Sequence, residues 1–483
     1  MPRGALEVAD IFRDHGAAWR RAQAGHRRLG QLKATAAIEQ CRTAALGGHV
    51  DECDACGHVR MSYNSCRDRH CPKCQRPQQA AWLAQRLERL LPVPYFHVVF
   101  TIPDQLNPLA LRNREVVYQL LFATAAQTLL ALARDPKHLG ADIGITAVLH
   151  TWGQNLLLHP HLHCVVTGGG LSLDGTRWVP GHPRYFLPVK VLAKLFRGKF
   201  LHALHRAWKH GQLGLTGSTA ELADPHAWSA FKNRLYRKDW VVYAKPPFGG
   251  PEHVFRYLGR YTHRVAISNH RLLNVTDGQV TFRIKDYTDR GRKKTLTLDA
   301  VDFLRRFLLH VLPTRFVRIR HYGLSAGRNV QRKLATARRL LEPQQTPPIV
   351  STPPASDASE PQSWAERFRD LTGIDIMACP CCGGRLIRRQ ALPPHSPLLT
   401  LTAAARASHM TPHSLRGPLC PAERLPGVFF LARQPLVRSR SHSTSVFRSG
   451  FCCLQLLPHI APFNVTTLAA ATTPPLPSPS LQQ

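Results

Sequence analysis

Two Cys-x-x-Cys pairs in the N-terminal part constrain this chain more than any other feature of its sequence. They are Cys53-x-x-Cys56 and Cys71-x-x-Cys74, with fourteen residues between the pairs. Each pair can place two thiolates on one ion, and four thiolates at about 2.3 Å close a tetrahedral Zn²⁺ site. Clustered pairs of this kind favour a metal over disulfides or buried free thiols. The spacing therefore predicts one structural zinc site in this region.

Other cysteines and a histidine lie close to this pattern or repeat part of it. Cys66 and His70 fall between the two pairs and are further candidate zinc ligands. Much later in the chain, Cys379, Cys381 and Cys382 form half of a zinc knuckle. No partner pair for this half is evident from the sequence, so it is a weaker prediction of metal binding.

The charge of the chain indicates a polyanionic partner. Lys and Arg number 64 and Asp and Glu 30, which gives a net charge of +34 over 483 residues. So large a charge repels itself in a compact fold, and neutralisation of nucleic-acid phosphates is its usual purpose. The first residues mix charges where a secretory signal needs an apolar run, and no apolar run suggests a membrane span. We expect a cytoplasmic, nucleic-acid-associated protein without a small-molecule substrate.

The middle of the chain alternates strand-like and helical patterns. Residues 94–103 form an apolar, strand-like run, whereas residues 113–135 and 298–313 have helical periodicity. Residues 272–288 predict a hairpin closed at Asp277-Gly278, with an apolar face and a basic face that carries Arg283 and Lys285. These patterns predict an α+β body, and the two basic residues are candidate DNA contacts.

Shifts in composition predict the domain boundaries. A Pro/Ser-rich stretch follows the body, and the final residues are poor in acids and rich in Pro, Ser and Thr, which favours disorder. The expected order is a helical lead-in with the zinc module over 1–90, a catalytic body over 91–342, a linker over 343–365, a short Cys-containing module over 366–390 and a disordered tail over 391–483.

His161-Leu162-His163 is a candidate metal site. Residues i and i+2 of a strand share one face, so the two imidazoles can bind one divalent cation. A structural histidine pair is an equally frequent explanation of this pattern taken alone. A third ligand is needed, and the nearby candidates are Gln154, His150 and His159.

Tyr257 and Tyr261 are candidate nucleophiles. Four residues apart, they would lie on one face of a helix. An aromatic core stripe is the simpler explanation, but Arg256, Arg260 and Arg264 surround the phenols with positive charge, which favours phenolate and phosphate alike. A tyrosyl hydroxyl can attack a phosphate that a metal polarises.

Three blocks, taken together, resemble one known family. They are CDACGHVRMSYNSCRDRHCPKCQ, HTWGQNLLLHPHLHCVVTGGG, and YLGRYTHRVAISNHR followed by HVLPTRFVRIRHYG. In combination and order they resemble the IS91-type transposases, which belong to the HUH single-strand endonucleases. The resemblance extends over about 8–385, and the tail from about 391 departs from it.

The resemblance implies a fold and a set of roles. It implies an HUH endonuclease-like antiparallel sheet with flanking helices, preceded by a small zinc-binding module. His161 and His163 would be the histidines that bind catalytic Mg²⁺ or Mn²⁺, with Gln154 as the expected third ligand. Tyr257 and Tyr261 would be the paired nucleophiles, and Cys53 to Cys74 would hold the structural Zn²⁺.

The leading hypothesis is a transposase that nicks and rejoins single-stranded or hairpin DNA at the ends of a mobile element through a 5′-phosphotyrosine. The chain has no G-x-x-x-x-G-K-[ST] phosphate loop, consistent with strand transfer that conserves bond energy. A replication initiator or relaxase with the same chemistry is an alternative. A non-catalytic, zinc-dependent nucleic-acid-binding protein is another. An HxH metallohydrolase unrelated to DNA would explain neither the charge nor the zinc module.

Overall fold

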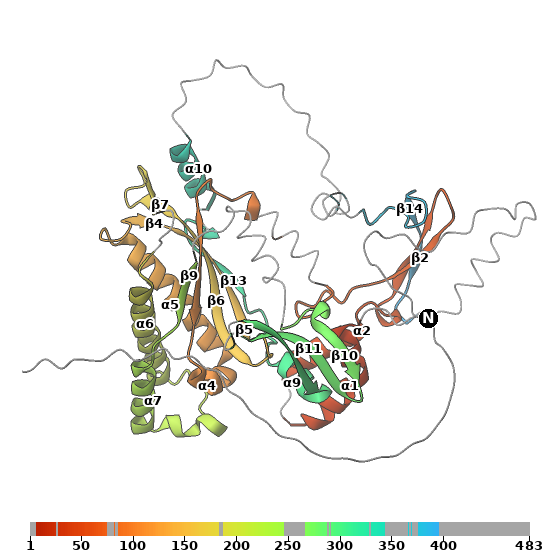
Figure 1. Ribbon diagram of the computed structural model, residues 1–483, viewed down its shortest axis with the longest axis horizontal. Coiled ribbons are helices and arrows are strands. Elements are labelled where there is room, and N and C mark those ends of the chain that lie inside the picture. Colours follow the sequence, from red (N-terminus) through yellow and green to blue (C-terminus); the bar gives the residue numbers. More distant parts are fainter. Residues whose placement is uncertain are drawn as a thin grey trace, which may run out of the picture. The chain divides into compact units, whose positions relative to one another are not determined.

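The structure is a computed structural model (Figure 1), and the fold is described for part of the chain. The described residues are 6–25, 28–74, Trp82, 86–182, 187–245, 266–286, Asp289, 291–327, 330–342, Glu366, Arg369 and 375–395.

A five-stranded sheet forms the centre of the body, and every neighbouring pair of its strands is antiparallel. In spatial order the strands are β13 (Ile319–Gly323), β5 (Gly144–Trp152), β6 (Leu158–Thr167), β3 (Tyr95–Thr101) and β9 (Val242–Lys245). The strand predicted over 94–103 is thus β3, in the interior of this sheet.

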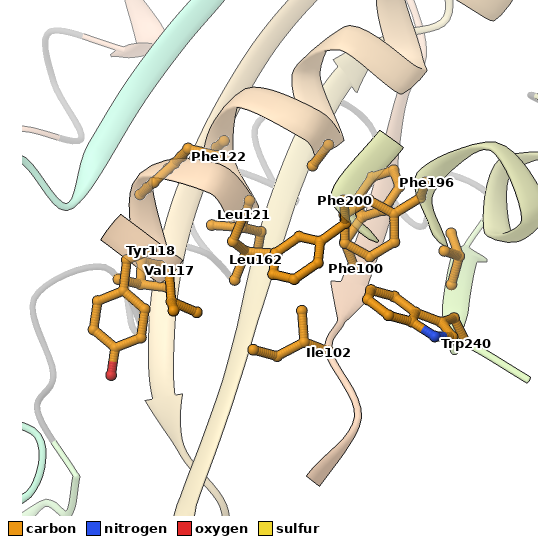
Figure 2. Packing of buried hydrophobic residues seen from close by; sticks show 14 of the residues in the cluster. Phe100, Ile102, Val117, Tyr118, Leu121, Phe122, Leu162, Phe196, Phe200 and Trp240 are labelled. Carbon is orange, nitrogen blue, oxygen red and sulfur yellow. The ribbon is translucent and has the colours of Figure 1, made fainter. Parts of the chain in front are cut away.

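Helices cover one face of the central sheet (Figure 1). They are α4 (Asn107–Arg112), α5 (Arg114–Arg134) and α6 (Val189–Lys209), and α7 (Pro225–Arg237) packs against α6. Figure 2 shows Phe100 of β3 and Leu162 of β6 meeting Phe196 and Phe200 of α6. The Phe100 and Phe196 rings lie 4.9 Å apart, edge to face. One face of β3 and β6 is therefore buried under α5 and α6, and the side chains that alternate with Phe100 and Leu162 lie on the opposite face.

Helix α5 is long and apolar enough to span a membrane by length and composition. In this fold it is a core helix, because Val117, Leu121 and Phe122 are fully buried against the sheet and α6 (Figure 2). Its bounds agree with the helix predicted over 113–135.

The N-terminal helices share a second core with residues far along the chain. Helices α1 (Val8–Ala22) and α2 (Leu29–Gln40) pack against α9 (Ala300–Leu308) and the sheet of β10 (Leu272–Thr276), β11 (Gln279–Asp286) and β12 (Arg292–Asp299). Phe12 and Phe307 meet edge to face at 5.3 Å. The helical lead-in, which is predicted to share one domain with the zinc module over 1–90, therefore packs against residues of the body.

The predicted hairpin over 272–288 is confirmed. Its turn is Asp277-Gly278, where both residues have positive φ, 51° and 72°, as a tight primed turn requires. Val280 and Phe282 are buried, while Arg283 and Lys285 are exposed on the opposite face. Helix α9 spans Ala300–Leu308, shorter than the helical pattern over 298–313: Leu298 and Asp299 belong to strand β12, and the His310 and Val311 amides bond three residues back, to the Phe307 and Leu308 carbonyls, before Pro313.

The N-terminal cysteine region forms a small sheet with a distant segment. Its central strand β1 (Gly48–Cys53) pairs with β2 (Val59–Tyr63) on one side and with β14 (Leu386–Leu392) on the other, both antiparallel. Part of the segment expected as a separate module over 366–390 thus completes the N-terminal sheet. The linker over 343–365 and the tail beyond 395 lie outside the described residues.

Smaller elements complete the described fold. A three-stranded sheet, in the order β4-β7-β8, and helix α10 lie near the end of the central sheet that carries Val165. Their bounds are β4 (Ala141–Asp142), β7 (Gly169–Ser172), β8 (Trp178–Pro180) and α10 (Val330–Leu341). Short 3₁₀ turns span Ala44–Leu46, Asp104–Leu106, Gly217–Ala223 and Asn269–Arg271. The α+β class with antiparallel sheets is confirmed.

Candidate active site and metal centres

Histidines line the face of the central sheet that the α5 and α6 core leaves uncovered. Leu162 of β6 points into that core, so His161 and His163 on either side of it face the opposite way. His150 of β5 lies directly opposite His161 in the strand register. His97 of β3 lies on the same face, diagonal to His163. The antiparallel register thus gathers four imidazoles from three strands.

Three of these imidazoles converge on one point. Ring nitrogens of His150, His161 and His163 all lie within 4.8 Å of one another. The Nε2 atoms of His161 and His163 are 3.1 Å apart. This spacing fits three ligands around one divalent ion, and the prediction that His161 and His163 share a face is confirmed.

The hydrogen bond that His161 makes through Nδ1 leaves the lone pair of its Nε2 atom directed toward His163, where a shared cation would bind. The His161 Nδ1 lies 2.7 Å from the carbonyl oxygen of His159, which can only accept, so Nδ1 carries the proton. Burial, and then the nearby charge of His159, lowers the pKa of His161 to about 4. Burial also holds the pKa of His163 well below its ordinary value. Neutral imidazoles are the form that binds metals.

His97 lies behind His163 and was not singled out from the sequence. Its Nε2 is 2.8 Å from His163 Nδ1, and the two rings stack at 5.0 Å. Histidines that bind metals usually form a hydrogen bond through their other ring nitrogen, which orients the ring. The signal that could have found His97 is a histidine within the otherwise apolar strand β3.

The other candidate third ligands lie in or beside the turn between β5 and β6. Gln154 belongs to this turn, and its carbonyl accepts a hydrogen bond of 2.6 Å from Arg271. His159 is largely exposed, and its carbonyl orients His161. The structure gathers His150 with the two predicted histidines, so His150 is the stronger candidate among the three.

The predicted nucleophiles Tyr257 and Tyr261 lie outside the described residues, as do Arg256, Arg260 and Arg264. Described residues on either side of this segment contact a histidine strand or the turn between two of them. Before the gap, Lys245 pairs with His97 across β9 and β3. After it, Arg271 donates to Gln154 in the turn between the histidine strands.

The predicted zinc site combined the wrong cysteine pairs. Among the described residues the structure forms two groups of four sulfur atoms instead of one. They are Cys41, Cys66, Cys71 and Cys74, and Cys53, Cys56, Cys379 and Cys382. The reason is strand β1, which ends at Cys53 and directs the first pair toward β14 rather than toward Cys71. Cys41 and Cys66 complete the group around the second pair.

Both groups fit a tetrahedral zinc ion. Four ligands at about 2.3 Å place neighbouring sulfur atoms about 3.8 Å apart. The observed sulfur separations are 3.3 Å for Cys41 and Cys74, 3.5 Å for Cys66 and Cys74, and 3.4 Å for Cys53 and Cys382. All exceed the 2.05 Å of a disulfide by far.

His70 has a structural role instead of the predicted one as a possible ligand. Its Nδ1 lies 3.0 Å from an Asp68 carboxylate oxygen, and its Nε2 accepts a hydrogen bond from the Leu312 amide. Both ring nitrogens are therefore used within the protein, and His70 joins the cysteine region to the body.

Two known protein families match separate regions of this sequence. A family described as a transposase zinc-binding domain matches residues 11–102, and one described as "Putative transposase" matches residues 144–333. A protein of Sinorhizobium fredii named "Putative transposase y4qJ" is 51% identical over 382 residues, which cover 79% of this chain and 94% of that protein. The chain belongs to the IS91 family of transposases.

A second relative of this IS91-family transposase carries a more specific name. The transposase for insertion sequence element IS801 of Pseudomonas savastanoi pv. phaseolicola is 28% identical over 371 residues, which cover 73% of this chain and 82% of the relative. No solved structure matches the chain. The transposase is thus an enzyme that acts on DNA, and its cysteine clusters together with the zinc-binding domain support structural Zn²⁺.

The two matched regions divide the site residues of the transposase. The zinc-binding region includes the whole first cluster, Cys41 to Cys74, and two cysteines of the second cluster. The other region includes His150, His161 and His163. Cys379 and Cys382 lie outside both regions.

A basic strand face offers a surface for phosphate. On β11 and β12, Lys285 lies directly opposite Lys293 in the register, next to Arg283, and all three are exposed. Like charges directly opposite each other destabilise a sheet, and a bound polyanion relieves that cost. The exposed side of this hairpin therefore suits the DNA partner of a transposase.

We expect stability to fall in acid because of a buried histidine beside the site. The His310 Nε2 donates to the Leu156 carbonyl, and its Nδ1 accepts from the Thr151 hydroxyl. Burial lowers its pKa to about 3, against about 6.5 in an unfolded chain. Between these values the unfolded state binds the extra proton, so the free energy of unfolding decreases as pH falls, by up to about 1.4 kcal/mol per pH unit.

Urea unfolding of the transposase between pH 4 and 7.5 measures this effect. His310→Gln should reduce the pH dependence of the unfolding free energy by about one proton. His226→Gln is the matched control, because the exposed His226 on α7 loses little water on folding. An equal pH dependence in wild type and His310→Gln would contradict the expectation.

Proposed function

We propose that the transposase nicks and rejoins single-stranded or hairpin DNA at the ends of its element through a 5′-phosphotyrosine intermediate. The observation that carries this proposal is the convergence of His150, His161 and His163 on one sheet face. It accounts for a divalent ion, Mg²⁺ or Mn²⁺, that would polarise the scissile phosphate. Three imidazoles favour Mn²⁺, because Mg²⁺ prefers oxygen ligands. We keep Gln154 as an additional candidate ligand.

In the proposed chemistry one phosphodiester replaces another. The hydroxyl oxygen of Tyr257 or Tyr261 bonds to phosphorus, the bond from phosphorus to the 3′ oxygen breaks, and the phenolic proton passes to the 3′-OH product. The protein then holds the 5′ end as a phosphodiester. A free 3′-OH reverses the step without ATP, and two tyrosines allow one to hold the donor end while the other cuts the next strand.

The flanks of the tyrosine segment support this assignment. Tyr261 is five residues from Ala266, which packs in the same cluster as Leu156 of the turn between the histidine strands. Five residues span at most about 18 Å when extended. Tyr257 is twelve residues from Lys245, the partner of His97. One described end of the segment therefore pairs with the strand of His97, and the other end shares a hydrophobic cluster with the turn between β5 and β6.

We propose that DNA contacts come from basic side chains near this face and that the zinc module positions the DNA. The contacts proposed are Arg256, Arg260, Arg264, Arg283 and Lys285. With DNA as its substrate, the protein would act in the bacterial cytoplasm during rolling-circle-like transposition. The body over 91–342 would form the catalytic domain.

We expect Lys285→Gln/Lys293→Gln to weaken binding of single-stranded DNA by a similar factor for every sequence. Removal of two phosphate contacts should reduce the slope of log K against log salt by about 1.4, since each contact contributes about 0.7 for single strands. Fluorescence anisotropy at several salt concentrations measures the slope. Lys137→Gln/Lys209→Gln removes the same charge from other exposed positions and should leave the slope almost unchanged.

The test of the proposed function is a covalent adduct. The full chain is incubated with labelled single-stranded DNA from the ends of its own element, with Mn²⁺, with Mg²⁺ or without metal. We expect a denaturation-resistant protein-DNA adduct that needs metal and forms at lower Mn²⁺ than Mg²⁺ concentrations. Binding of the same DNA without any adduct or nicking would indicate a non-catalytic binding protein instead.

A further inference from the structure

Two turns of the same construction face each other in the second cysteine cluster. The first begins at Cys53, whose amide donates to the His58 carbonyl while the Gly57 amide donates to the Cys53 carbonyl. The second begins at Cys379, whose amide donates to the Gly384 carbonyl while the Gly383 amide donates to the Cys379 carbonyl. Each turn therefore presents a Cys-x-x-Cys pair closed by the same two hydrogen bonds.

A glycine in the left-handed region closes each turn. Gly57 has φ of 67° and Gly383 of 77°, which side chains with a Cβ rarely adopt. Both turns have the sequence motif Cys-x-x-Cys-Gly, although more than 300 residues separate them. Two segments far apart in the chain thus form the same type of turn, and each turn presents a pair of thiolates.

The sulfur atoms of the two turns interleave. Cys53 lies 3.4 Å from Cys382, and Cys56 lies 3.7 Å from Cys379. In the second turn the Cys381 and Gly384 amides point at the sulfur atoms of Cys379 and Cys382, each at 3.4 Å. Donors aimed at sulfur stabilise the thiolate form, which is the form that binds metal.

Strand pairing brings the two turns together in a defined register. Cys53, the last residue of β1, pairs with Leu386 of β14. Beyond this pair Asp54 continues the contact, because its amide donates to the Arg385 carbonyl and its carboxylate accepts from the Arg385 amide. Cys53, Cys379 and Leu386 form a small buried cluster. The meeting of the turns is therefore part of the fold.

We propose that Cys53, Cys56, Cys379 and Cys382 bind a second Zn²⁺ ion, which fastens residues 375–395 to the N-terminal sheet. Four thiolates select a soft, tetrahedral ion and leave no position open for a substrate, so the site is structural. The region matched by the zinc-binding family, residues 11–102, contains only two of these four cysteines, Cys53 and Cys56. The inference does not depend on the proposed cleavage chemistry.

Zinc content of purified, reduced protein tests the proposal. We expect two zinc ions per chain in the wild type and one in Cys379→Ser/Cys382→Ser. Cys381→Ser is the matched control and should keep two, because the Cys381 sulfur lies beside His58 and outside both four-sulfur groups. With Co²⁺ in place of zinc, thiolate-to-cobalt absorption should fall by half in the double variant. One zinc in the wild type, or a double variant that loses neither zinc nor thiolate-to-cobalt absorption relative to the wild type, would overturn the proposal.

A second experiment requires no change to a cysteine. A site-specific protease sequence is placed in the Pro/Ser-rich stretch 343–362 of the full chain, which is then cut and analysed by size exclusion. We expect the C-terminal fragment to remain bound in zinc and to separate in a chelator. In the Cys379→Ser/Cys382→Ser background it should separate without chelator. A fragment that stays bound after zinc removal would show that no metal fastens it.

Discussion

Replacing His161 or His163 by alanine should reduce strand cleavage by at least about a thousandfold while leaving DNA binding within about twofold of wild type. The reduction corresponds to about 4 kcal/mol of transition-state stabilisation, the scale expected when an ion that polarises phosphate is lost. Binding persists because affinity comes mainly from Arg and Lys contacts to phosphates. Cleavage rates under single-turnover conditions and anisotropy binding curves provide the two measurements.

The neighbouring residues supply the controls for this experiment. His150→Ala should match the loss in His161→Ala, because its ring nitrogen belongs to the same group of three. His159→Ala should retain cleavage within a few-fold, since His159 orients His161 through its backbone carbonyl, which alanine keeps. Full cleavage by His161→Ala, or equal losses in His159→Ala and His150→Ala, would rule out this set of ligands.

The second large effect concerns the two tyrosines. Tyr257→Phe/Tyr261→Phe should eliminate the covalent DNA adduct, because no phenolic oxygen remains to attack phosphorus. Each single Phe variant should still form an adduct but should fail to complete strand transfer, which needs two nucleophiles. Adduct yield on denaturing gels and joined product on sequencing gels measure the two steps.

Peptide mapping of the adduct identifies the nucleophile directly. We expect the DNA on Tyr257 or Tyr261 in the wild type and only on the remaining tyrosine in each single variant. Tyr243 provides a matched control, because its exposed side chain lies on β9 near the same segment. Tyr243→Phe should leave adduct formation unchanged, and a DNA adduct mapped to Tyr243 would refute the assignment.

Local patterns in the sequence predicted local structure well. The Asp277-Gly278 turn and the helix over 113–135 depend on residues close together in the chain, so their signals are complete within a short window. His161 and His163 share a face for the same reason, since the period of a strand is two. His97, and the choice of His150 over Gln154 and His159, required knowledge of the strand register, which pairs β3 and β5 with β6 and which no local pattern contains.

Local spacing did not predict correctly which cysteine pairs share a metal site. Spacing paired Cys53 and Cys56 with the nearest second pair, Cys71 and Cys74, because short loops are the usual way to build a zinc site. Strand pairing instead decides which cysteines meet. Because β14 pairs with β1, Cys379 and Cys382 from the far end of the described chain lie beside Cys53 and Cys56. The sequence signal for this pairing is the Cys-x-x-Cys-Gly motif, which occurs at residues 53–57 and again at residues 379–383.

The pairing of β1 with β14 also imposes an order on biosynthesis. Cys382 follows Cys53 by 329 residues, and at about 5 to 20 residues per second a ribosome needs roughly 15 to 65 s to translate that interval. Until β14 is translated, β1 can pair only with β2, as a two-stranded hairpin that is marginal by itself, and Cys53 and Cys56 lack their partner thiols. A gene copy with a premature stop codon before Cys379 would therefore yield a transposase whose N-terminal sheet lacks its third strand, β14, and whose Cys53 and Cys56 lack the second pair of thiols.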